Sequence, residues 1–123
     1  FNKVRNHFGV GRIAQAGALA ALKDQEYLAQ TLVRAANARG RLTAIAQENG
    51  FDPLPSATNF VTMDCGRDGD YARRVLAGLV ARGIFVRMPG VAPHDRCIRV
   101  SLGDDAALDA FAETLPQVIA DLG

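Results

Sequence analysis

One short stretch near the C-terminal end, Cys97-Ile98-Arg99-Val100-Ser101-Leu102-Gly103, constrains the fold more than any other. Its apolar residues at positions 98, 100 and 102 alternate with other types, which is the period of a strand buried on one face only. Gly103 ends the run, and Asp104-Asp105 then supply the negative charge that favours a helix N-terminus. The pattern therefore predicts a strand with one buried and one open face, followed directly by a helix.

Arg99 lies in the middle of this strand, on the open face. Its planar guanidinium fork fits a carboxylate or a phosphate, so the residue is a candidate for ligand binding. The strand alone also allows a surface arginine or a structural ion pair. A second strand is predicted over 84–88, and a hairpin between the two would bring Arg87 close to Arg99. Two guanidinium groups side by side repel each other unless an anion, an acid or water separates them, which favours an anion site.

Two helices are predicted before the first strand. Residues 12–23 are alanine-rich and apolar almost all round, which is typical of a helix buried on several sides. We expect it to pack against chain outside these 123 residues. Asp24 is a plausible N-cap for a second helix over about 25–49, which Gly50 ends. At 1.5 Å per residue this helix would be roughly 35 Å long, so we expect it to connect two domains.

The remaining elements complete an α+β fold: a small three-stranded, possibly four-stranded, sheet with helices packed on one face, preceded by a long interdomain helix. If the first two strands are parallel, a right-handed crossover joins them. Pro116 should kink or restart the last helix, since proline removes an N–H donor. The predicted elements are a strand at 59–63, a helix from 69 or 70 to about 82, strands at 84–88 and 97–102, and a helix from about 105.

Composition narrows the class of protein. The 123 residues have a net charge of +1, which argues against a general nucleic-acid or membrane-surface role. No apolar run approaches the roughly 20 residues that span a bilayer. Cys65 and Cys97 lack the spacing of a metal site, and we expect free thiols in a reducing, cytoplasmic compartment. Pairing between these two cysteines stays open from the sequence.

Candidate catalytic side chains are few. Neither His7 nor His94 has a nucleophile or carboxylate at the spacing of a catalytic triad. The pair Asp104-Asp105 is better explained by the start of a helix than by an acid–base dyad. Lys3 and Lys23 are the only lysines, and solvated side chains are the simpler interpretation of both. We therefore predict no catalytic residue and no metal site in this chain.

Four segments, in their order along the chain, resemble the class I/II pyridoxal-phosphate-dependent aminotransferases. The histidinol-phosphate aminotransferase branch is the most similar. Each segment is weak alone, whereas the ordered set is fairly specific and covers nearly the whole chain. The segments are Ile13–Leu22, Pro55–Val61, Gly83–Arg87 and Cys97–Gly103.

The resemblance implies the C-terminal part of a fold type I enzyme, with residues 1–24 as the end of the large cofactor-binding domain and 25–123 as the small domain. Arg99 would bind the substrate α-carboxylate, and the small domain would close during amino-group transfer between an amino acid and a 2-oxo acid. Pyridoxal phosphate would be the electron sink, held mainly by the large domain of a homodimer. The lysine that bonds to this cofactor lies upstream in the family, so these 123 residues alone should be inactive.

Other interpretations remain open at this point. A decarboxylase or a lyase on the same fold would use the same arginine. A stand-alone α+β ligand-binding or regulatory module is a different class of protein, in which the helix at 12–22 would be an oligomer contact. A structural interaction domain without a ligand is a third.

Overall fold

The computed structural model describes residues 9–123. His7 and Lys3 lie outside the described residues. The chain divides into two compact units, and the boundary between them falls inside helix α2 (Gln25–Glu48), between Val33 and Arg34. The second unit, 34–123, contains the sheet and the predicted site.

The first unit contains helix α1 (Arg12–Lys23) and the start of α2. Asp24 caps α2 as predicted, because its carboxylate accepts a hydrogen bond of 2.9 Å from the backbone N–H of Tyr27. No residue of α1 is buried, and Ile13 is 90% exposed. The predicted packing of this helix against chain outside these 123 residues is not tested by the described residues and stays a prediction.

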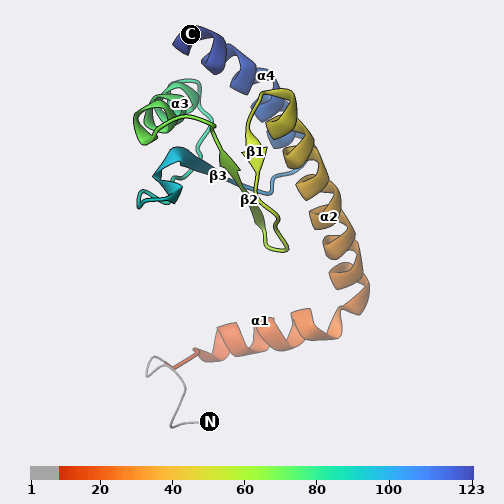
Figure 1. Ribbon diagram of the computed structural model, residues 1–123. Coiled ribbons are helices and arrows are strands. Elements are labelled where there is room, and N and C mark those ends of the chain that lie inside the picture. The colour runs from red at the N-terminus through yellow and green to blue at the C-terminus, as the bar shows by residue number, and fades with distance from the viewer. Residues whose placement is uncertain (1–8) are drawn as a thin grey trace. The chain divides into compact units, whose positions relative to one another are not determined.

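The sheet has three antiparallel strands in the order β1 (Asp52–Pro53), β2 (Phe60–Asp64) and β3 (Cys97–Ser101), as Figure 1 shows. In the register of β2 and β3, Val61 pairs with Val100 and Thr62 with Arg99. The α+β class and the three-stranded sheet are thus confirmed. The connection between β2 and β3 includes helix α3 (Gly69–Ala81), yet the two strands run antiparallel.

The identity of the third strand differs from the prediction. Residues 84–88 form no regular strand, and only Arg87 makes a bridge, antiparallel to Arg99 on the edge of β3 away from β2. Pro89 lacks an N–H donor and Gly90 has a φ of 73°, so the chain turns away at once. The third strand is instead β1. Local sequence patterns did not predict it, because β1 contains Pro53 and proline is unfavourable inside sheets. Pro53 is tolerated there because β1 is an edge strand. Because β2 and Arg87 both pair antiparallel with β3, the segment at 84–88 runs parallel to β2, and α3 lies in the connection between them.

The core of the second unit lies against one face of the sheet. Val61 and Met63 of β2 and Ile98 and Val100 of β3 are buried there in one cluster with side chains of three helices. These helices are the second half of α2, α3, and α4 (Asp105–Leu122). Their buried members are Ala38, Leu42, Ile45, Ala46, Tyr71, Ala72, Val75, Leu79, Leu108, Phe111, Leu115 and Val118.

Helix α4 continues without interruption past Pro116, so the predicted restart is wrong. Proline removes the hydrogen bond that its N–H would have donated to the preceding turn. Leu115 and Val118 on either side are buried at 0% and 1% exposure, and this packing holds both halves of the helix against the core.

The closest approach of α3 and α4 generates a stability prediction. A Cβ added at Gly78 would lie 2.6 Å from Cγ1 of Val118, a buried and rotationally stiff side chain. We expect Gly78→Ala to destabilise the protein by about 1–3 kcal/mol, as overpacking does. Chemical denaturation measures the change. Gly40→Ala is the control, because its Cβ would meet open space and should stabilise α2 by about 0.5–1 kcal/mol. Equal effects of both changes would contradict the predicted overpacking.

Candidate functional site

The candidate site lies on the face of the sheet opposite the core. Because successive side chains of a strand alternate between faces, burial of Ile98 and Val100 places Arg99 on this open face. Arg99 is paired on both sides, with Thr62 of β2 and with Arg87. Its backbone N–H donates to the carbonyl of Arg87 at 2.6 Å and its carbonyl accepts from the N–H of Arg87 at 3.1 Å. Arg87 and Arg99 therefore lie side by side, paired through their backbones, as predicted.

The Arg99 guanidinium has an aromatic neighbour and, among residues 9–123, no carboxylate partner. Its Cζ lies over the ring of Phe60, 4.7 Å from the ring centroid. Four other arginines of the second unit pair with aspartates: Arg41, Arg73, Arg82 and Arg96. These ion pairs neutralise four positive charges within the second unit. The half-buried guanidinium of Arg99 remains available to an anion.

Asp64 of β2 lies on the open face and could have neutralised Arg99, but it forms an ion pair with Arg96 instead. Its Oδ1 accepts hydrogen bonds of 2.8 Å from Nε of Arg96 and of 2.8 Å from the backbone N–H of Gly66. Partial burial alone would raise the pKa of Asp64, but these bonds outweigh it and lower the pKa below the usual value. Asp64 is therefore a structural anion for Arg96.

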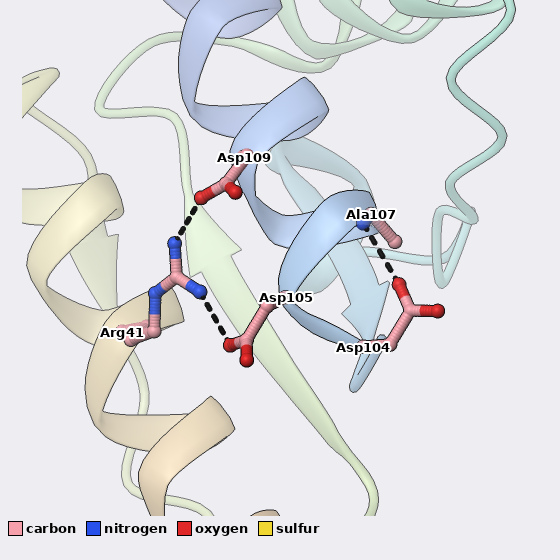
Figure 2. Close-up of polar contacts among 5 residues, drawn as sticks. All are labelled: Arg41, Asp104, Asp105, Ala107 and Asp109. Atoms are coloured by element: carbon pink, nitrogen blue, oxygen red, sulfur yellow. Dashed lines mark hydrogen bonds and ion pairs between the residues drawn. The ribbon is translucent and has the colours of Figure 1, made fainter.

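The acidic start of α4 is also structural, as predicted. The carboxylate of Asp104 caps the helix by accepting from the N–H of Ala107 at 2.9 Å (Figure 2). Figure 2 also shows Arg41 of α2 reaching two carboxylates of α4, with Nη1–Oδ1 of 2.8 Å to Asp105 and Nη2–Oδ1 of 2.5 Å to Asp109. The hydrogen bond to Asp109, together with Asp105, raises the pKa of Arg41 despite opposing desolvation. Local sequence patterns gave no sign of this contact, because its partners are more than sixty residues apart.

The other candidate side chains form no catalytic arrangement within the described part of the chain. His94 is exposed in a short 3₁₀ helix, His94–Arg96, which precedes β3. No group of three or more metal-ligating side chains occurs among residues 9–123. None of the helices in this range combines the length and the apolar content needed to cross a membrane.

Both cysteines are free and buried, which confirms the expected thiols. Burial raises the pKa of Cys65 to about 12 and also raises the pKa of Cys97. Because the thiolate is the nucleophilic form, neither side chain is prepared for nucleophilic catalysis.

The described residues do not make a site for pyridoxal phosphate by themselves. Their single lysine, Lys23, is exposed at the end of α1, and it lines none of three cavities whose walls are formed by residues of the second unit. No reaction step through this cofactor can be assigned to these residues. What they do provide is a cationic, partly desolvated surface at Arg99.

Comparison with known proteins decides the family. The sequence profile of "Aminotransferase class I and II" matches residues 1–115. The chain belongs to this aminotransferase family. The resemblance stated from four segments is thereby confirmed.

Individual aminotransferases agree over nearly the whole chain. The crystal structure of histidinol-phosphate aminotransferase from Sinorhizobium meliloti, in complex with pyridoxal-5'-phosphate, superposes with a TM-score of 0.92 at 53% identity and covers 100% of this chain. Histidinol-phosphate aminotransferase 2 of Pseudomonas fluorescens is 37% identical over 119 residues, and histidinol-phosphate aminotransferase 1 of Mesorhizobium japonicum is 34% identical over 118. The chain spans about a third of the length of these relatives: 34% of the solved structure and 31% of each curated relative.

A more distant neighbour shows how widely the fold is used. A decarboxylase from Sulfurospirillum multivorans superposes with a TM-score of 0.62 at 21% identity, which shows a shared fold alone. A fold by itself does not assign a reaction, so the role of each residue must come from the site.

The Asp64–Arg96 pair generates a prediction of pH dependence. Because the folded-state pKa of Asp64 is lowered, its stabilising contribution is fully present above the unfolded value of about 3.9 and is lost as the pH falls through the folded pKa. We expect the wild-type protein to lose stability more steeply below about pH 4 than Asp64→Asn. Denaturant titrations at a series of pH values from neutral to acid measure the two slopes. Asp52→Asn, at an exposed edge position, should keep the wild-type slope. Identical slopes for Asp64→Asn and the wild type would contradict the prediction.

Proposed function

We propose that this chain is the C-terminal part of a pyridoxal-phosphate-dependent aminotransferase, in which Arg99 binds the α-carboxylate of the amino-acid and 2-oxo-acid substrates. Residues 1–24 would end the large domain, and residues 25–123 would form the small domain with its connecting helix. The observation that carries the proposal is the guanidinium of Arg99, which is half-buried and has no carboxylate partner in the described chain.

The physical argument rests on charge. A half-buried cation loses part of its hydration, and an ion pair or a ligand anion compensates for that loss. The fold places Arg87 beside Arg99 instead of an acid, which adds positive potential at the same edge. A carboxylate accepting two N–H bonds from the Arg99 fork would satisfy the guanidinium and be oriented at the same time.

The similar proteins suggest the class of substrate. They are named histidinol-phosphate aminotransferases, and histidinol phosphate carries a phosphate group in addition to its amine. A guanidinium fork accepts phosphate as well as carboxylate, so Arg99 could serve an amino substrate of either kind. We propose that the oxo-acid partner is held through its carboxylate, since every 2-oxo acid has one.

The remaining parts of the enzyme would come from outside the described residues. Pyridoxal phosphate supplies the electron sink for amino-group transfer when it is bound, and we propose that the large domain of a cytoplasmic homodimer holds most of it. Binding of a carboxylate to Arg99 would favour closure of the small domain over the substrate. On this proposal, residues 1–123 alone do not catalyse the transfer.

Substitution of Arg99 in the full-length protein tests the proposal. We expect Arg99→Ala to weaken binding of the preferred amino-acid donor by about 3 kcal/mol, roughly 150-fold, because two charge-assisted hydrogen bonds are lost. The donor is first chosen as the amino acid, among the twenty, that gives the largest change in cofactor absorbance. Titration of the same absorbance change then gives the affinity.

Arg73→Ala is the matched control, because this exposed arginine pairs only with Asp70 on its own helix. It should leave the affinity unchanged. An unchanged affinity for Arg99→Ala would remove Arg99 from the substrate site and would overturn the proposed function of this residue.

A further inference from the structure

We propose that Phe60 is a positioning residue for Arg99: its ring supports the guanidinium group so that all the N–H donors remain available to a carboxylate. This inference rests on the proposed function of Arg99 and extends it to a second residue. In the sequence, Phe60 is distinguished only by lying in the predicted strand at 59–63.

The register of the sheet places the two side chains together. Phe60 is the first residue of β2 and pairs with Ser101, while Thr62 pairs with Arg99. Phe60 is therefore a diagonal neighbour of Arg99 on the same face, within reach of a long side chain. The Cζ of Arg99 lies 4.7 Å from the centroid of the Phe60 ring, within the range of a cation–π contact.

The backbone of Phe60 is itself held by local hydrogen bonds. Its carbonyl accepts from Oγ of Ser56 at 2.6 Å and from Oγ1 of Thr58 at 3.2 Å. The preceding residue, Asn59, accepts from the N–H of Leu102 at 2.9 Å, which ties this end of β2 to the end of β3. The ring therefore projects from a backbone position that is fixed relative to both strands.

An aromatic ring beside Arg99 leaves the N–H donors of the guanidinium unbound, whereas an acid in its place would bind them. The five N–H donors of a guanidinium bind to oxygen or nitrogen lone pairs, and the Phe60 ring under Cζ of Arg99 carries none, so the ring does not take the place of a carboxylate acceptor. A carboxylate in the same place would accept two of these bonds and close the fork. Asp64, the other diagonal neighbour on β2, is held by Arg96 at 2.8 Å and does not compete. Arg99 is thus supported without being neutralised.

Loss of the ring would remove a favourable cation–π contact and would also free the long arginine side chain to sample more rotamers. Both effects reduce carboxylate binding. Neither acts on a ligand that has no anionic group for Arg99 to bind. This difference separates positioning of Arg99 from a general contribution to folding.

The experiment uses the full-length enzyme loaded with its cofactor and four variants: Phe60→Leu, Phe60→Tyr, Arg99→Ala and the double variant Phe60→Leu/Arg99→Ala. The probes are the amino-acid donor chosen above and the corresponding amine without its α-carboxylate. Affinities come from the absorbance titration, and denaturant unfolding shows that each variant is folded.

We expect Phe60→Leu to weaken donor binding about 5- to 10-fold, within the range of a lost cation–π contact. Its affinity for the amine should stay at the wild-type value. Phe60→Tyr, which keeps the ring, should bind the donor as the wild type does. Adding Phe60→Leu to Arg99→Ala should cause no further loss, because the group that the ring supports is already absent.

Two outcomes would overturn the role of Phe60 while leaving that of Arg99 intact. One is wild-type donor affinity in Phe60→Leu together with a large loss in Arg99→Ala. The other is an equal loss for donor and amine in Phe60→Leu, which indicates a structural effect alone. Unchanged donor affinity in Arg99→Ala would instead overturn the proposed function itself.

Discussion

The antiparallel pairing of β2 with β3 is the constraint on which the candidate site depends. A strand whose alternate residues are buried has no freedom in register, because a slip by one residue would move every side chain to the opposite face. Val61 and Val100 are paired and buried at 1% and 6% exposure. Burial of these residues on one face fixes Arg99 on the other, beside Phe60. The hydrophobic core therefore determines where the guanidinium lies.

The distribution of charge around this sheet explains why Arg99 differs from its neighbours. Asp64, on the same face of the sheet as Arg99, is paired with Arg96, and Asp105 and Asp109 of α4 are paired with Arg41. These pairs connect β2 to the segment before β3, and α2 to α4. Arg99 remains over an aromatic ring. This is why we propose Arg99, and not one of the paired arginines, as the group that binds a substrate carboxylate.

Much of the fold could be predicted from local patterns. Alternation identified β3, and a strand was also predicted at 59–63, where β2 forms. Capping residues such as Asp24 and Asp104 marked helix starts that the hydrogen bonds confirm. The role of β1 could not be predicted, because Pro53 pairs only at the edge of the sheet, and which strand forms the edge is a property of the whole fold. Arg87 makes a single bridge where a full strand was expected, because Pro89 and Gly90 turn the chain away from β3.

The candidate site was predictable only in part. Alternation placed Arg99 on the open face, and the resemblance assigned it a ligand, which stays a prediction. The contact with Phe60 depends on a pairing register across 39 residues of sequence, and the absence of a described acid partner depends on which aspartates other arginines bind. Neither can be inferred from residue order. The composition of α1 predicts burial against chain outside these 123 residues, and with no residue of the helix buried among the described ones this stays a prediction.

A crystal structure of the full-length protein with its cofactor and the bound amino-acid donor tests the central claim most directly. The account predicts two hydrogen bonds between the Arg99 guanidinium and the donor carboxylate, at about 2.7–2.9 Å each, with Phe60 still packed against the guanidinium. A donor carboxylate bound to a different cation, with the Arg99 fork closed by a carboxylate of the protein, would contradict it.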